Sequence, residues 1–102
     1  SKGLDIAAAR GTPVKAAADG TVLYAGDGVR GYGKLILLRH SSTALTAYGY
    51  NDSLSVRKDQ TVKAVQTIAT VGDSGLLDGQ TKLHIELRIN GKAIDPTPYL
   101  QK

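Results

Sequence analysis

The segment Lys82–Ile89, with the sequence KLHIELRI, decides how this chain folds. Apolar and polar residues alternate along it without a break, which is the period of a β-strand with one buried face. The residues predicted to point into a core are the apolar ones, Leu83, Ile85, Leu87 and Ile89. The opposite face carries four ionisable groups in a row and is predicted to form the wall of a groove: Lys82, His84, Glu86 and Arg88.

The rest of the chain consists of short strand patterns separated by turn residues such as Asp19-Gly20. Strands are predicted over residues 14–17, 21–25, 34–40, 45–50, 62–64, 67–71, 82–89 and 92–94. Asn90-Gly91, between the last two strands, predicts a type I′ hairpin turn. Asn51-Asp52-Ser53 is predicted to cap a single helical turn. Because no segment has a sustained helical period, we expect an all-β, antiparallel two-sheet sandwich or split barrel with a groove.

Length and composition restrict the function. A chain of 102 residues is expected to form one domain, and its start within a patterned segment predicts the C-terminal part of a longer protein. The chain has no cysteine, which excludes disulfides and cysteine metal sites, and it has no apolar run long enough to span a bilayer. A net charge of +4 favours an acidic partner. Nucleic acid is not expected, because there is no basic run and no helix-turn-helix pattern.

Five segments, in this order, resemble one known family. They are KGLDIAAARGTPVKAAADGTVLYAG, RGYGKLILLRH, TAYGYNDSL, TVKAVQTIATVG and LHIELRINGKAIDPTPYL. Together they cover nearly the whole chain and are similar to the LytM-type (lysostaphin-like) metallopeptidase domain. RGYG and YGYN are especially similar to its degenerate members, the murein hydrolase activators of the EnvC and NlpD kind. The resemblance implies the duplicated hybrid-motif fold of that family.

The resemblance also implies where an active site would be. Active members bind zinc through a His-x-x-x-Asp pair and the second histidine of His-x-His, and two further histidines act on substrate and water. The corresponding residues here are Ser1, Asp5, Tyr50, Lys82 and His84, of which Asp5 and His84 keep the family residue. A catalytic zinc usually has three protein ligands. A protonated lysine has no lone pair and repels a dication, and a tyrosine is no general base near neutrality. We therefore predict a catalytically inactive domain without a cofactor.

The positions around the degenerate site are predicted to form a partner-binding groove. Tyrosine and arginine are typical of binding hot spots. The predicted groove consists of Lys2, Arg30, Tyr32, Tyr48, Tyr50, Lys82, His84 and Arg88. The resemblance implies that the partner is a periplasmic zinc N-acetylmuramoyl-L-alanine amidase, activated to split septal peptidoglycan during cell division. No membrane contact is expected for this domain. The parent protein either engages a division-site transporter or is a lipoprotein, and the sequence leaves both open.

Several alternatives remain open from the sequence. The domain could instead be a peptidoglycan-binding module or a residual zinc endopeptidase. A biotinyl-type carrier is disfavoured, because the tip at residues 72–75 has no lysine. His40 is either a substitute metal ligand or, as we expect, a strand-end histidine bonded to the backbone. Without metal, His84 would bond to Asp5 or to a tyrosine hydroxyl, and Asp5 would bond to His84 or to the backbone. Val65 stands where relatives have glycine, so its turn must differ or be strained.

Overall fold

In the computed structural model, which describes residues 3–99, the chain forms nine β-strands and one short 3-10 helix. The elements are β1 Leu4–Ala7, β2 Pro13–Lys15, β3 Gly20–Gly26, β4 Lys34–Arg39, β5 Ala44–Leu54, β6 Thr61–Val62, β7 Thr67–Val71, β8 Lys82–Ile89, β9 Lys92–Ile94 and η1 Thr97–Tyr99. All of the strand pairs are antiparallel. The predicted all-β fold is therefore confirmed. No helix in this part of the chain is long and apolar enough to cross a membrane.

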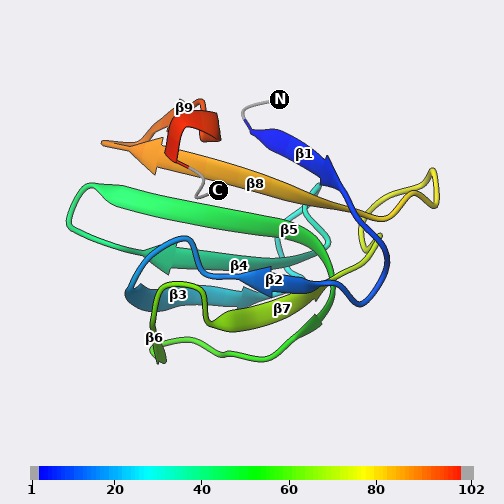
Figure 1. The fold of residues 1–102 in the computed structure, drawn as a ribbon, viewed down its shortest axis with the longest axis horizontal. Helices are drawn as coiled ribbons and strands as arrows, with labels where there is room; N and C mark the ends of the chain where they lie inside the picture. Colours follow the sequence, from blue (N-terminus) through cyan, green and yellow to red (C-terminus); the bar gives the residue numbers. More distant parts are fainter. Residues whose placement is uncertain (1–2, 100–102) are drawn as a thin grey trace.

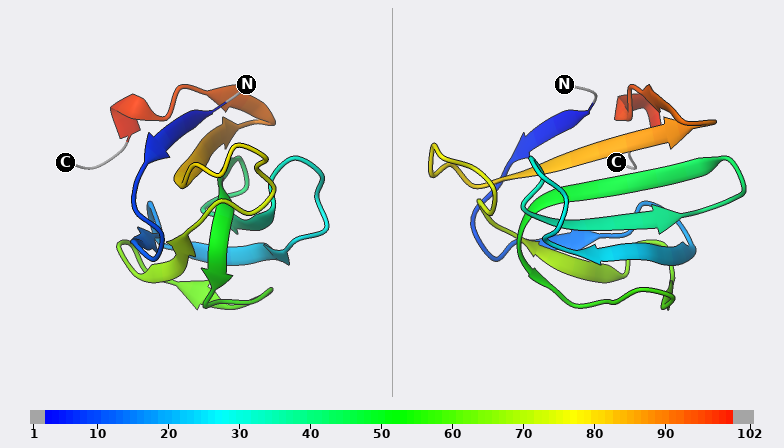
Figure 2. Two further views of the ribbon diagram at one scale, coloured as in Figure 1. Left: turned by 90° about the vertical axis from the view of Figure 1, so that its right-hand side faces the viewer. Right: turned by 180° about the vertical axis from the view of Figure 1, so that it is seen from behind.

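The strands form two layers that are joined through β5. The larger layer has the order β1-β8-β5-β4-β3-β6, and β9 pairs with the outer end of β8 (Figure 1). The first half of β5 lies between β4 and β8, whereas its last residues, Asn51 to Leu54, pair with β7. Strand β7 pairs in turn with β2, so the curve of β5 carries the chain into the second layer (Figure 2).

The core lies between the two layers and is built mainly from aliphatic side chains. Its most deeply buried members include Val14, Val22, Ile36, Leu38, Tyr48, Ile68, Val71 and Ile85. β-branched residues are common here because they pack well on a pleated surface. Burial of this apolar area is the main stabilising contribution in a domain of this size.

The local predictions were correct where the sequence pattern was strong. Strands 67–71, 82–89 and 92–94 begin and end as predicted. Asn90 and Gly91 have φ angles of 53° and 78°, as a type I′ turn requires. The predicted helical turn at Asn51-Asp52-Ser53 is wrong, because β5 continues through it. The Asn51 side-chain amide donates to the carbonyls of Lys34 and Tyr48, and these tertiary bonds replace a helix cap.

Two similar turns connect the second layer. In each, a glutamine N–H donates to the carbonyl three residues earlier, Gln60 to Arg57 and Gln66 to Lys63, both at 3.1 Å. The residue before each glutamine has a positive φ, 76° at Asp59 and 71° at Val65. Aspartate tolerates this region, but a β-branched residue does not. Of the two alternatives that the sequence left open for this turn, a different turn or strain, the positive φ of Val65 fits strain.

Candidate functional site

The degenerate site lies where β1, β5 and β8 meet. In the strand register Asp5 is directly opposite His84, and Gly49 is opposite His84 on the other side. The loop between β3 and β4 brings Tyr32 to the same place, because the carbonyl of Tyr32 accepts the N–H of Tyr50 at 2.8 Å. The fold therefore brings together residues that are as far apart as 79 positions in the sequence.

His84 is held between two carboxylates. Its Nδ1 is 2.6 Å from Oδ1 of Asp5, and its Nε2 is 2.7 Å from Oε2 of Glu86. The residue is only 5% exposed. Each ring nitrogen of His84 therefore faces one carboxylate oxygen, and the ring links Asp5 to Glu86.

Glu86 is the centre of the network; the sequence placed it on the groove wall but not among the predicted partner-binding residues. It is 3% exposed, and besides His84 it accepts from the Tyr32 hydroxyl at 2.8 Å and from Arg88 Nε at 3.0 Å. Burial raises the pKa of Glu86, but the hydrogen bonds from His84, Tyr32 and Arg88 outweigh it, so its pKa lies below the ordinary value. Burial, followed by the bond to Glu86, raises the pKa of Tyr32. The bond to Glu86 raises the pKa of Arg88.

Two tyrosines and a lysine cover this network. The Tyr50 and Tyr32 rings lie 5.6 and 5.8 Å from the His84 ring, centroid to centroid. The Lys82 ammonium is 3.7 Å from Oδ2 of Asp5 and 3.9 Å from Oδ2 of Asp78. It also lies 5.9 Å from the centroid of the Tyr50 ring, within the range of a cation–π contact. A positive charge therefore already lies against the Asp5 carboxylate.

Tyr50 faces the site because of its backbone conformation. Tyr48 pairs with Ile85 and shares its inward face, so strict alternation would send Tyr50 inward as well. Tyr50 instead has a φ of 68°, which breaks the alternation and places its ring beside His84. A positive φ is unfavourable for a bulky residue, and such strain is frequent at functional sites.

Two of the predictions for this region need correction. Tyr48 does not line a groove: it has no exposed surface, and its hydroxyl accepts from the Ala17 N–H and bonds to Thr46. The polar face of β8 is not an open wall, since His84 and Glu86 are buried. The backbone of Gly3 packs so closely on both that an added Cβ would lie 2.9 Å or less from their atoms. Lys2 and Ser1 lie outside the described residues.

The remaining predicted residues lie at two places. Asp5 and Lys82 are partly exposed at the rim of the site, and Arg30 is exposed in the loop that supplies Tyr32. His40 lies elsewhere: its Nδ1 bonds the carbonyl of Asp19 at 2.8 Å, and its Nε2 bonds Thr46 Oγ1 at 2.6 Å. The expected backbone bond of a strand-end histidine is confirmed.

The residues at this site do not fit the zinc ion that the resemblance implies for active members. The two retained donors are engaged with each other at 2.6 Å, and His84 Nε2 is engaged with Glu86 at 2.7 Å. Lys82 adds a positive charge beside Asp5. Within residues 3–99, no group of three or more His, Cys, Asp or Glu residues is arranged to hold a metal ion.

The fold is similar to solved structures of peptidases. The catalytic domain of the antimicrobial peptidase lysostaphin from Staphylococcus simulans superposes with a TM-score of 0.91 and 30% identity. That match covers all of this chain and 80% of the lysostaphin domain.

Similar curated proteins are longer than this chain. The chain is 49% identical over 102 residues to a lipoprotein NlpD/LppB homolog of Pseudomonas aeruginosa, covering 34% of that protein. It is 48% identical over 100 residues to the murein hydrolase activator NlpD of Escherichia coli K12, covering 98% of this chain and 26% of the relative. The chain thus spans about a third or less of these relatives. The profile described as peptidase family M23 matches residues 1–96, and the chain belongs to this family.

Proposed function

We propose that this domain is a catalytically inactive M23 domain that binds and activates a periplasmic zinc N-acetylmuramoyl-L-alanine amidase. Activation would split septal peptidoglycan during cell division. The observation that carries the proposal is the closed chain of contacts from Lys82 through Asp5 and His84 to Glu86, which occupies the groups that catalysis would need. The name of the Escherichia coli relative, a murein hydrolase activator, supports the same role. The lipoprotein name of the Pseudomonas aeruginosa relative supports a place in the cell envelope.

The partly exposed rim is the docking surface in this proposal. Lys82 and Arg30 provide positive charge, and Tyr50 provides an aromatic ring that is neither buried nor fully exposed. Such a surface suits an acidic segment of the partner, because complementary charges steer encounter and fix register. Activation then requires that the domain bind the open amidase more tightly than the closed one.

The buried network is the support for this surface. The Tyr32 hydroxyl donates to Glu86 at 2.8 Å, and the rings of Tyr32 and Tyr50 pack on the His84 ring, so the buried residues hold both tyrosines in place. A rim that is already rigid loses less entropy on binding. Arg88 belongs to this support rather than to the docking surface, because two of its guanidinium nitrogens contact Glu86 at 3.0 Å.

Dye release from labelled peptidoglycan tests the proposal with the domain alone, the amidase alone, and both together. We expect release above the amidase baseline only in the mixture. Release by the domain alone would show that the site is catalytically active. A mixture that stays at the amidase baseline would contradict activation.

A double variant, Lys82→Gln with Arg30→Gln, tests the docking surface. It removes the rim charge without placing a new carboxylate beside Asp5 and Asp78. We expect it to lose most of the activation while keeping the wild-type fold. Lys92→Gln is the matched control, since Lys92 is exposed on β9, opposite Ile89 at the far end of β8. Equal activation by the double variant and the control would exclude the rim as the docking surface.

A further inference from the structure

A second polar site lies at the other end of the strands. A cavity of about 550 Å³ is formed where β3 begins, β4 ends and β6 lies alongside. Its lining includes Asp19, Thr21, Arg39, Ser42, Thr61 and Lys63. Arg39 is opposite Leu45 on β5, five residues before Tyr50, which corresponds to about 17 Å along a strand. The cavity is therefore separate from the degenerate site.

The strand register places three side chains of the cavity in one row. Thr21 on β3 is directly opposite Thr61 on β6 and Arg39 on β4. The neighbouring residues Val22 and Val62 point into the core, so the row faces outward. Opposite residues have Cβ atoms about 4.5–5.5 Å apart. The row thus presents two hydroxyls and a guanidinium to one ligand.

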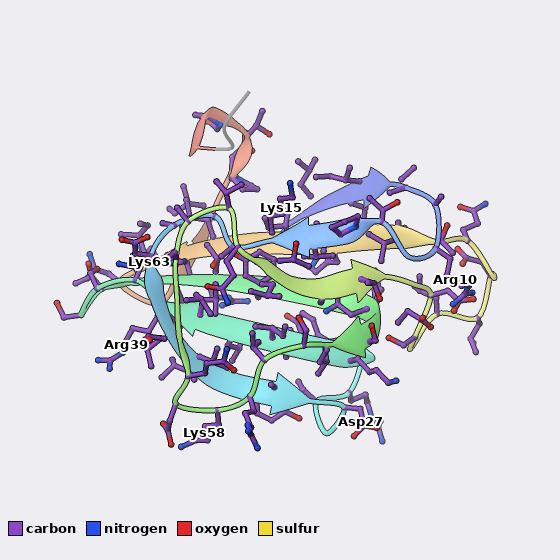
Figure 3. The ribbon with its side chains drawn as sticks, turned by 60° about the horizontal axis from the view of Figure 1, so that its bottom comes forward. Arg10, Lys15, Asp27, Arg39, Lys58 and Lys63 are labelled. Atoms are coloured by element: carbon purple, nitrogen blue, oxygen red, sulfur yellow. The ribbon has the colours of Figure 1, made fainter. Side chains whose placement is uncertain are left out.

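The cations of this cavity are unpaired, unlike Lys82 and Arg88 of the degenerate site. Arg39 and Lys63 are exposed at the same end of the molecule (Figure 3), and neither forms an ion pair with any residue in the described part of the chain. Arg10, by comparison, bonds both Asp52 and Asp73. Asp19 also lines the cavity, and its Oδ1 accepts the Ala64 N–H at 2.7 Å.

His40, the remaining ionisable group of the lining, is fixed by its hydrogen bonds. Its Nδ1 faces the carbonyl oxygen of Asp19, so it must donate there, and its Nε2 meets the Thr46 hydroxyl, which is able to donate to it. Both ring nitrogens of His40 are thus occupied within the protein. The charged side chains left to face a ligand are Arg39, Lys63 and Asp19, and together they carry a single net positive charge, which matches a monoanion better than a dianion.

We infer that this cavity binds the carboxylate of a sugar acid, the group that murein glycan carries once an amidase has hydrolysed its muramoyl–alanine amide bond. The guanidinium of Arg39 and the ammonium of Lys63 bind the carboxylate, and the hydroxyls of Thr21, Thr61 and Ser42 bind the sugar. A fork-shaped guanidinium suits a planar carboxylate, and the cavity is within the size range of small-molecule sites. The inference rests on the proposed function in that it would hold the activator on glycan that the amidase has already cut.

A pair of matched sugars tests this inference. N-acetylmuramic acid carries a carboxylate that N-acetylglucosamine lacks, and either sugar is titrated into the isotope-labelled chain while its amide NMR signals are followed. We expect N-acetylmuramic acid to shift the signals of Thr21, Arg39, Ser42 and Thr61, and N-acetylglucosamine to shift them at least about tenfold less. Equal responses to the two sugars, shifts confined to other strands, or a response to inorganic phosphate alone would overturn the inference.

Arg39→Ala with Lys63→Ala is the test variant. Both side chains are exposed, so we expect the variant to keep the wild-type fold, which the dispersion of its amide signals checks. We expect its affinity for N-acetylmuramic acid to fall at least about tenfold. Lys15→Ala with Lys92→Ala removes the same charge elsewhere on the surface. An equal loss of affinity in this control would mean that only the overall positive charge matters, and it would refute a specific binding site in the cavity. Because the test variant keeps the rim residues Lys82 and Tyr50, it should still activate the amidase on soluble fragments, which separates this inference from the proposed function.

Discussion

Replacing Glu86 by alanine removes the acceptor on which the buried network depends. Glu86 accepts from three side chains and is 3% exposed. The variant leaves His84 with an unpaired nitrogen and Arg88 with an unpaired guanidinium. Removing one partner of a buried ion pair costs about 3–5 kcal/mol. Because Arg88 is partly accessible to water, we expect the lower end, about 3 kcal/mol, which for a domain of this size lowers Tm by at least about 12 °C.

The stability difference between wild type and Glu86→Ala should depend on pH. The pKa of Glu86 lies below its ordinary value of 4.5, so the unfolded chain binds this proton more readily than the folded one. The contribution of the carboxylate is therefore fully present above about pH 4.5 and is lost as the pH falls through the lowered pKa of the folded state. The two proteins should differ most near pH 7 and converge in acid.

Urea unfolding followed by circular dichroism at several pH values measures both effects. Asp52→Ala serves as the control, because Asp52 pairs with Arg10 at the surface, where both side chains are about half exposed, and such pairs contribute little. A loss for Glu86→Ala no larger than for Asp52→Ala would refute the network as a structural element. A difference that grew in acid would refute the assigned direction of the pKa.

Three further predictions concern the backbone and the core. Val65→Gly should raise the free energy of unfolding in urea by about 1 kcal/mol, because glycine adopts a φ of 71° without strain. The control Val29→Gly, at a position where φ is not positive, should lower the free energy of unfolding. A lower stability of Val65→Gly would contradict this reasoning. Tyr48→Phe should cost about 1–3 kcal/mol in thermal unfolding, since the Ala17 N–H loses its acceptor, and an unchanged Tm would argue against that bond. Gly75→Ala should lower the melting temperature more than Gly79→Ala. Both glycines have a positive φ, but a Cβ added at Gly75 would lie 2.6 Å from the Gly33 nitrogen, whereas a Cβ added at Gly79 would have no atom within 4 Å. Equal melting temperatures for the two alanine variants would contradict that clash.

Much of the fold could be predicted because its signals are local. The alternation of residues 82–89 is a property of neighbouring side chains, and the Asn90-Gly91 turn depends on its own two φ angles. The strain at Val65 could also be predicted, since it follows from a side chain that is wrong for a turn. The helical turn at residues 51–53 failed for the opposite reason, because distant carbonyls compete for the Asn51 amide.

The site was predicted only in part. Asp5, Lys82, His84 and Tyr50 do come together, but neither the burial of Glu86 nor the withdrawal of Tyr48 into the core could be read from the pattern. Alternation assigned the polar face of β8 to a groove. In the fold, the Gly3 backbone and the side chains of Asp5 and Tyr32 lie against His84 and Glu86 on that face.

The sequence by itself determined that this chain forms antiparallel strands of the M23 type and that its metal-site residues are incomplete. These features depend on residue identity and on short-range periodicity. The tertiary structure decided what these residues contact, because Asp5 and His84 are brought together across 79 positions and Tyr50 is turned toward them by a single positive φ. Because His84 and Glu86 are buried, they pair with each other and with Asp5, Tyr32 and Arg88, since an unpaired ion in a dry interior is costly.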